Sequence, residues 1–160
     1  MTRLLAAAGS ALFFALAPGV VAGLLPWWLT GWQFKAFPLP LRLVGALLTF
    51  AAGLVLVSAF ARFVMEGIGT PAPVAPTRHL VVGGLYRYVR NPMYLAVVTA
   101  IVGQALLFGR WELLAYAAGA AAAMWAFATF YEEPHLAERF GAEYREYRRA
   151  VPGWWPRLRR

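Results

Sequence analysis

No cysteine occurs in this chain of 160 residues, which excludes a disulfide, a thiolate nucleophile and a cysteine-ligated metal. Histidine is nearly as scarce, because His79 and His135 are the only two, and they are too scattered to form a recognisable metal site. Charge is also low, at 14% of the residues against about a quarter in an average soluble domain. We therefore predict no metal site and no thiol chemistry.

Apolar residues dominate instead, at 61% of the chain with a mean hydropathy of +0.59. No charged residue lies between Arg3 and Lys35, and the windows 43–61, 91–109 and 113–131 are each 19 uncharged residues long. A helix of that length rises about 28 Å, close to the roughly 30 Å hydrocarbon core of a bilayer. We predict an all-α, polytopic membrane protein with about four transmembrane helices and a cytoplasmic C-terminal amphipathic helix, forming a single membrane-embedded domain over 1–160.

The predicted transmembrane helices span about 4–25, 41–64, 92–108 and 113–131, and a tail helix spans 132–149. We interpret the first as a retained helix rather than a signal peptide, because it lacks a clear cleavage site, and expect it to end at Pro26. Three prolines in 70–76 predict an extended strap. In the fourth helix, small residues at four-residue spacing favour close helix packing, namely Ala115, Gly119 and Ala123.

The tail carries apolar and aromatic residues at helical spacing, which are Leu136, Phe140, Tyr144, Tyr147 and Val151. Such a face is also typical of a helix that lies on anionic lipid without any catalytic role.

The net charge of +8 would suggest a nucleic-acid partner in a soluble protein. Here eleven of the fifteen Lys and Arg residues lie in 62–90 and 139–160, with Arg3 at the N-terminus. Because cytoplasmic loops are enriched in Lys and Arg, we predict that both termini and both segments face the cytoplasm. The expected partners are the lipid bilayer and a lipophilic small-molecule acceptor, and no nucleic acid.

One candidate site is the hinge, residues 84–94, which we expect to precede the third transmembrane helix. It holds two arginines, an asparagine and three tyrosines, and a helix N-terminus stabilises anions while Arg binds carboxylate or phosphate. An ordinary cytoplasmic anchor is the alternative interpretation.

A second candidate is the acidic pair Glu132 and Glu133 at the end of the fourth transmembrane helix. Two acids there oppose the helix dipole, so a cation must compensate them. That cation is Arg87, Arg90 or a cationic ligand, and an internal salt bridge remains an equal alternative. His135 follows closely and could contact a ligand.

Together these segments resemble the isoprenylcysteine carboxyl methyltransferase family and its phospholipid methyltransferase relatives. The hinge resembles that family through Gly84, Tyr86, Arg87, Arg90, Asn91, Pro92 and Tyr94. The tail does so through Glu132, Glu133, Leu136, Phe140, Gly141, Tyr144, Tyr147, Val151, Pro152 and Pro156.

The resemblance implies an integral membrane methyltransferase whose hinge and tail fold over S-adenosylmethionine. By this resemblance the catalytic residues would be Arg90, Glu132 and Glu133. The cofactor-binding residues would be Tyr86, Arg87, Asn91, Pro92, Tyr94, His135, Tyr144, Tyr147, Val151 and Pro152.

The acceptor would be a lipidic or small amphiphilic molecule, and a carboxylate suits it because a carboxylate is already ionised at neutral pH. Residues 126–131 are almost wholly apolar, where the eukaryotic enzymes carry a polar residue, so a prenylated cysteine is not assumed. Two alternatives stay open: an NADPH-dependent membrane reductase of the sterol-reductase type, and a non-catalytic membrane protein.

Overall fold

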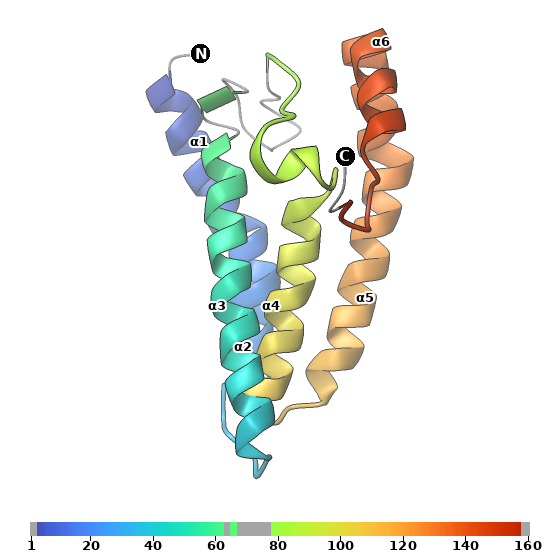
Figure 1. The fold of residues 1–160 in the computed structure, drawn as a ribbon. Coiled ribbons are helices and arrows are strands. Elements are labelled where there is room, and N and C mark those ends of the chain that lie inside the picture. Colours follow the sequence, from blue (N-terminus) through green and yellow to red (C-terminus); the bar gives the residue numbers. More distant parts are fainter. Residues whose placement is uncertain (1–2, 63–64, 67–77, 158–160) are drawn as a thin grey trace.

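A computed structural model describes residues 3–62, 65–66 and 78–157, and this part of the chain is helical without a strand (Figure 1). The predicted strap, 70–76, lies outside the described residues. In chain order the elements are α1 (Arg3–Leu16), η1 (Val20–Leu24), α2 (Leu25–Thr30), α3 (Leu39–Arg62), η3 (Gly84–Arg87), α4 (Pro92–Phe108), α5 (Glu112–Phe127), η4 (Ala128–Glu132) and α6 (Glu133–Ala150).

Three helical segments of the described chain are long and apolar enough to cross a membrane, namely Ala11–Thr30, Leu39–Arg62 and Glu112–Ala150. The fourth, α4, is also apolar and has 17 residues. The predicted all-α membrane protein is confirmed, with three to four helices suited to spanning.

The first transmembrane helix was predicted to end at Pro26, but it continues to Thr30. There Gly31 adopts a left-handed conformation with φ 60° and terminates it. Proline is tolerated at this point because it lies in the first turn of α2, directly after the π-helical turn η1. Side chains of α4 and α5 also bond to carbonyls of η1, as described below.

The closest packing in the bundle joins α3 to α4 through two glycines. A Cβ added to Gly45 would lie 2.5 Å from the carbonyl oxygen of Gly103, so neither position has room for a larger residue. On α5, Gly119 does not make such a close contact within the chain, because a Cβ added there meets nothing within 4 Å. Within the described residues, the contact through two glycines thus joins α3 to α4, and Gly119 makes no such contact.

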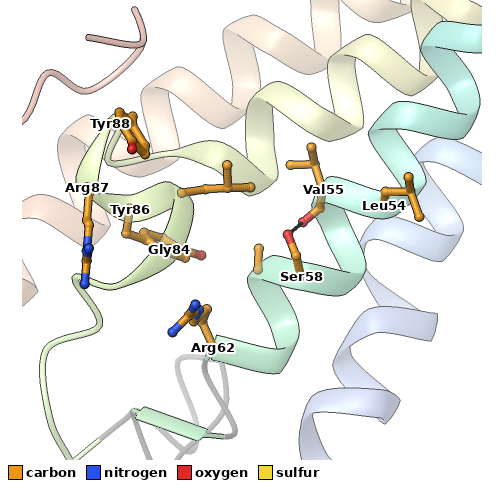
Figure 2. Close-up of a pocket in the computed structure, with 10 residues that line it drawn as sticks. Leu54, Val55, Ser58, Arg62, Gly84, Tyr86, Arg87 and Tyr88 are labelled. Carbon is orange, nitrogen blue, oxygen red and sulfur yellow. Dashed lines mark hydrogen bonds between the residues drawn. The ribbon is translucent and has the colours of Figure 1, made fainter. Parts of the chain in front are cut away.

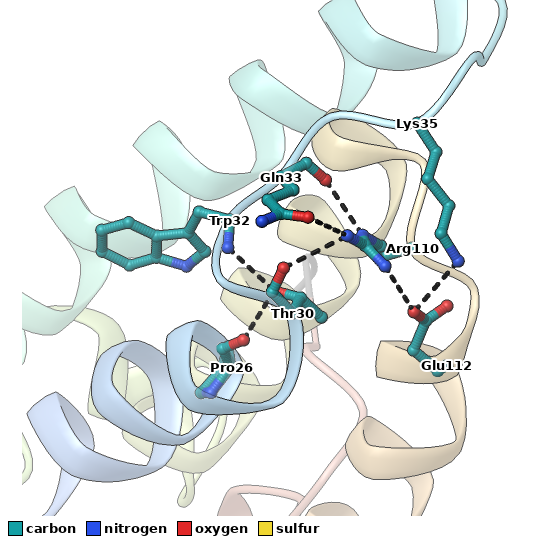
Figure 3. Close-up of polar contacts among 7 residues, drawn as sticks. All are labelled: Pro26, Thr30, Trp32, Gln33, Lys35, Arg110 and Glu112. Atoms are coloured by element: carbon teal, nitrogen blue, oxygen red, sulfur yellow. Dashed lines mark hydrogen bonds and ion pairs between the residues drawn. The ribbon is translucent and has the colours of Figure 1, made fainter.

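A polar network closes the end of the bundle opposite the hinge (Figure 3). Arg110, after α4, donates to the carbonyl oxygens of Thr30 at 3.2 Å and Gln33 at 2.9 Å. It also pairs with Glu112 at 3.2 Å, and Lys35 reaches the same carboxylate at 3.3 Å. These contacts attach the loop after α2 to the connection between α4 and α5, which fixes the first helix against that hairpin.

The tail is helical, as predicted, but it reverses direction at Gly141. This residue has φ 55° and ψ −120°, a combination that favours glycine. The guanidinium of Arg148 lies 3.1 Å from the Glu133 carboxylate, whereas fifteen residues of straight helix would separate them by about 22 Å. The tail therefore folds back, and the predicted single face along 136–151 is divided between two antiparallel halves.

Candidate functional site

The hinge and the C-terminal segment are held together by main-chain hydrogen bonds, at the end of the bundle where α1 begins (Figure 1). Three amides donate across this junction: Arg90 N–H to Pro152 O at 2.9 Å, Asn91 N–H to Gly153 O at 3.2 Å, and Arg157 N–H to Tyr88 O at 2.9 Å. The Asn91 side-chain amide adds a bond to Gly153 O at 3.1 Å. Asn91 and Pro92 begin α4, so the junction is built on a rigid helix end.

A buried ion pair reinforces this junction, and we name it with its partners the hinge–tail lock (Arg90, Glu133, Tyr144 and Arg148). The Arg90 guanidinium donates to Glu133 at 2.6 Å, to the Tyr144 hydroxyl at 3.1 Å and to the Val151 carbonyl at 3.0 Å. The two charged side chains are only 13% and 11% exposed. Arg148 pairs with the other Glu133 oxygen from a more exposed position. The sequence left open whether the acidic pair is compensated by an internal salt bridge or by a cationic ligand, and Glu133 forms an internal salt bridge.

Next to the lock lies a tyrosine cluster, formed by Tyr86, Tyr94 and Tyr147 with Glu132. The Tyr147 hydroxyl donates to the Tyr86 carbonyl at 2.7 Å, and Glu132 interacts with the Tyr94 hydroxyl. Burial, followed by the proximity of Tyr147 and Glu132, raises the pKa of Tyr86 well above its usual range. The cluster therefore presents neutral aromatic side chains around one carboxyl group.

Trp154 from the C-terminal segment stacks on Tyr94, with ring centroids 6.2 Å apart and an interplanar angle of 20°. Trp154, Gly153 and Arg148 were not predicted as site residues from the sequence. The available signal was their position within or next to the tail motif, since Trp154 follows Pro152 by two residues.

An apolar cavity of about 610 Å³ extends from the tyrosine cluster along the bundle and is open on the side of Gly119 and Ala123, which are exposed. Its walls come from the first helix, α4 and α5, and the lining residues are Phe13, Ala17, Val21, Tyr94, Tyr116, Gly119, Ala120, Ala123, Met124, Phe127 and Glu132. Along the α5–η4 segment, Tyr116 and Glu132 are the two extremes of this lining. Glu132 and Tyr94 consequently belong both to the cavity and to the tyrosine cluster.

A second cavity of about 560 Å³ lies between α3 and η3 (Figure 2). Arg62 faces the Gly84 turn there and pairs with Glu66 at 2.5 Å, and Glu66 accepts a bond from the Gly83 amide at 3.1 Å. Arg87 lines this second cavity and is exposed.

The other predicted site residues lie either at the junction of hinge and tail or outside it. Val151 and Pro152 meet the lock through their carbonyl groups, and Pro92 is buried as the first residue of α4. His135 is exposed and contacts the carbonyl oxygen of Tyr131 at 2.6 Å through its Nδ1. The structure therefore brings the hinge and tail residues together, with Arg87 and His135 at the periphery.

In a comparison with protein families, residues 41–143 of this chain match the family model described as phospholipid methyltransferase. This range covers well over half of the chain and includes the hinge, α4, α5 and both acids of the pair Glu132 and Glu133. Comparison with curated proteins gave no match.

Proposed function

The chain belongs to the phospholipid methyltransferase family and is a membrane methyltransferase, and from this premise we propose that it moves a methyl group from S-adenosylmethionine to an amphiphilic acceptor. One observation carries the proposal: Glu132 and Tyr94 line the apolar cavity and also form part of the tyrosine cluster. An acceptor whose chain lay in the cavity would present its polar end at the cluster. A cofactor beside the hinge would then meet it there.

The residues of the cluster fit the cofactor. When bound, S-adenosylmethionine supplies an electrophilic methyl group on a sulfonium, whose bonding electrons return to sulfur as the acceptor takes the methyl. The faces of Tyr86, Tyr94 and Tyr147 suit a sulfonium through cation–π attraction, and Glu132 suits an ammonium. Arg87, next to Tyr86 in sequence, offers a guanidinium to a carboxylate. His135, Val151 and Pro152 remain proposed cofactor contacts at the edge of the site.

We assign Arg90, Glu133, Asn91 and Tyr144 as positioning residues, because their polar groups bond to one another and to the C-terminal carbonyls. Methyl transfer gains most from holding the reactants in line, which a rigid hinge–tail junction supports. Glu132 is the acidic residue of the pair that lines the apolar cavity, so it is the acid proposed to contact ligands.

The proposed acceptor carries a nucleophile that is already deprotonated at neutral pH, such as a carboxylate. A carboxylate needs no base, and its reaction with a sulfonium removes one positive and one negative charge. A site shielded from water favours such a reaction, because opposite charges attract more strongly there.

Labelled methyl transfer to extracted host lipids tests the proposal. We expect incorporation by wild type, with Glu132→Gln reducing it roughly tenfold or more, the loss expected for a hydrogen bond to a charged group. Glu138→Gln is the matched control, because Glu138 is an exposed acid on α6. An alkali-labile product would indicate a methyl ester. Equal activity of the two variants would show that Glu132 does not belong to the site.

Ligand-induced thermal stabilisation separates the other functions. S-adenosylhomocysteine should stabilise the detergent-solubilised protein, whereas stabilisation by NADPH alone would identify a reductase. No response to either ligand, together with no methyl transfer, would favour a non-catalytic protein.

We also propose that the site faces the cytoplasm, since the segments 62–90 and 139–160 carry eleven of the fifteen Lys and Arg residues. The chain has no cysteine, so a single introduced one, Ala142→Cys, can be labelled without background. A membrane-impermeant thiol reagent should modify this cysteine only after the cells are permeabilised. Labelling in intact cells would contradict the proposed cytoplasmic orientation.

A further inference from the structure

The apolar cavity is kept open by the small side chains of α5. Gly119, Ala120 and Ala123 line it, and a Cβ built at Gly119 meets nothing within 4 Å. The small-residue pattern that suggested helix packing therefore creates space beside α5 at this point. Since the walls are almost entirely apolar and the only acidic lining residue is Glu132, the space suits a hydrocarbon chain whose polar end lies near that carboxyl.

Hydrogen-bonded side chains lie around Tyr116, the lining residue of α5 farthest in sequence from Glu132. The Tyr116 hydroxyl donates to the Val21 carbonyl at 2.6 Å, which joins α5 to η1. Next to it, the Gln104 amide donates to the Ala22 carbonyl at 2.6 Å and accepts from the Trp32 indole at 3.1 Å. Together Tyr116, Gln104 and Trp32 form a polar layer across the bundle.

A proline explains why this layer exists. Pro26 has no amide hydrogen, so one carbonyl of the turn before it, where Val21 and Ala22 lie, lacks its helical donor. In a membrane such carbonyls must be satisfied by neighbouring helices. Tyr116 and Gln104 supply the donors, and this requirement holds both side chains in place.

We propose that Tyr116 is the floor of the acceptor site and limits the length of the apolar chain that the site accepts. This proposal rests on the proposed function, because the occupant is taken to be the chain of the methyl acceptor. Sixteen residues separate Tyr116 from Glu132, a helical rise of about 24 Å, against roughly 30 Å for the whole hydrocarbon core. The lining residues of α5 and η4 thus extend over more than one leaflet and less than the whole hydrocarbon core.

Chain-length preference in binding tests the floor without relying on methyl transfer. The probes are straight-chain fatty acids of increasing length, which displace a fluorescent fatty acid from protein in phosphatidylcholine nanodiscs. For wild type we expect affinity to peak at one length and to fall roughly tenfold for longer chains, because a chain that reaches past Tyr116 would have to displace packed side chains.

Two substitutions should move the peak in opposite directions. Gly119→Leu places a side chain in the cavity one turn above the floor, so the preferred chain should shorten by about 4.5 Å. Tyr116→Ala removes the floor and should favour longer chains. Tyr116→Phe keeps the ring and loses only the hydroxyl bond, so its peak should stay in place.

Gly53→Leu is the matched control for Gly119→Leu, since Gly53 is also a helical glycine with nothing within 4 Å of an added Cβ, but it lies on α3 outside the cavity. The proposal is overturned by a flat profile in wild type, by absence of binding, or by a peak that does not move in Gly119→Leu and Tyr116→Ala. If the peak moves as expected but no methyl transfer from S-adenosylmethionine is found, the floor stands and the proposed function fails.

Discussion

Arg90→Ala should open the junction between the hinge and the C-terminal segment. The Arg90 side chain makes three bonds there, to Glu133, Tyr144 and Val151, and the paired side chains of Arg90 and Glu133 are 13% and 11% exposed. Removing one partner of a buried ion pair costs about 3–5 kcal/mol. Arg148 still compensates Glu133 in the variant, so we expect the lower end, about 3 kcal/mol.

Arg148→Ala is the matched control, because it removes a cation from the same carboxylate. Its side chain is 55% exposed, and exposed ion pairs contribute about 0–1 kcal/mol. Both substitutions therefore remove an arginine that pairs with Glu133, and they differ mainly in how deeply that arginine is buried.

Hydrogen exchange at the amides of Asn91 and Arg157 measures the opening directly, since each donates across the junction. A cost of about 3 kcal/mol corresponds to roughly a hundredfold faster exchange, whereas Arg148→Ala should give less than about a fivefold change. Equal effects of the two variants, or a change below fivefold for Arg90→Ala, would refute the view that the buried pair holds the tail on the hinge.

Three further predictions concern the glycine turn, the polar layer and the pH response. Gly141→Ala should destabilise by about 1–3 kcal/mol in thermal unfolding because of its φ of 55°, whereas Gly119→Ala should stabilise by about 0.5–1 kcal/mol. Gln104→Leu leaves the Ala22 carbonyl without its side-chain donor and should cost about 1–2 kcal/mol by the same measurement. Because the pKa of Tyr86 is raised in the folded state, folding favours the neutral phenol. This contribution to the free energy of unfolding is complete below about pH 10 and falls as the pH rises further. Tyr86→Phe and wild type should therefore differ in the pH dependence of stability only above that value.

The meeting of hinge and tail could be predicted from the sequence for a simple geometric reason. The third and fourth transmembrane helices are of similar length and are joined by a tight connection, so the chain returns to the end from which it left. The residues just before α4 and just after η4 must then be neighbours.

The sequence does not predict which of Glu132 and Glu133 pairs with Arg90 and which lines the cavity. Successive residues of a helix point about 100° apart, so the rotation of the α5–α6 segment decides which acid meets Arg90 and which one lines the cavity. The reversal at Gly141 was missed for a similar reason: the apolar spacing of 136–151 is compatible with one continuous helix, and only the contact between Glu133 and Arg148 requires two halves.

The sequence by itself determined the length and polarity of the helices, the place of the hinge and the absence of thiol chemistry, because these depend on local composition and spacing. Tertiary structure alone decided which carboxyl group is buried in an ion pair, which small residues pack and which line a cavity, and that Tyr116 and Glu132 line the same cavity. Those features depend on the relative rotation and depth of helices distant in sequence, which a pattern along one helix does not specify.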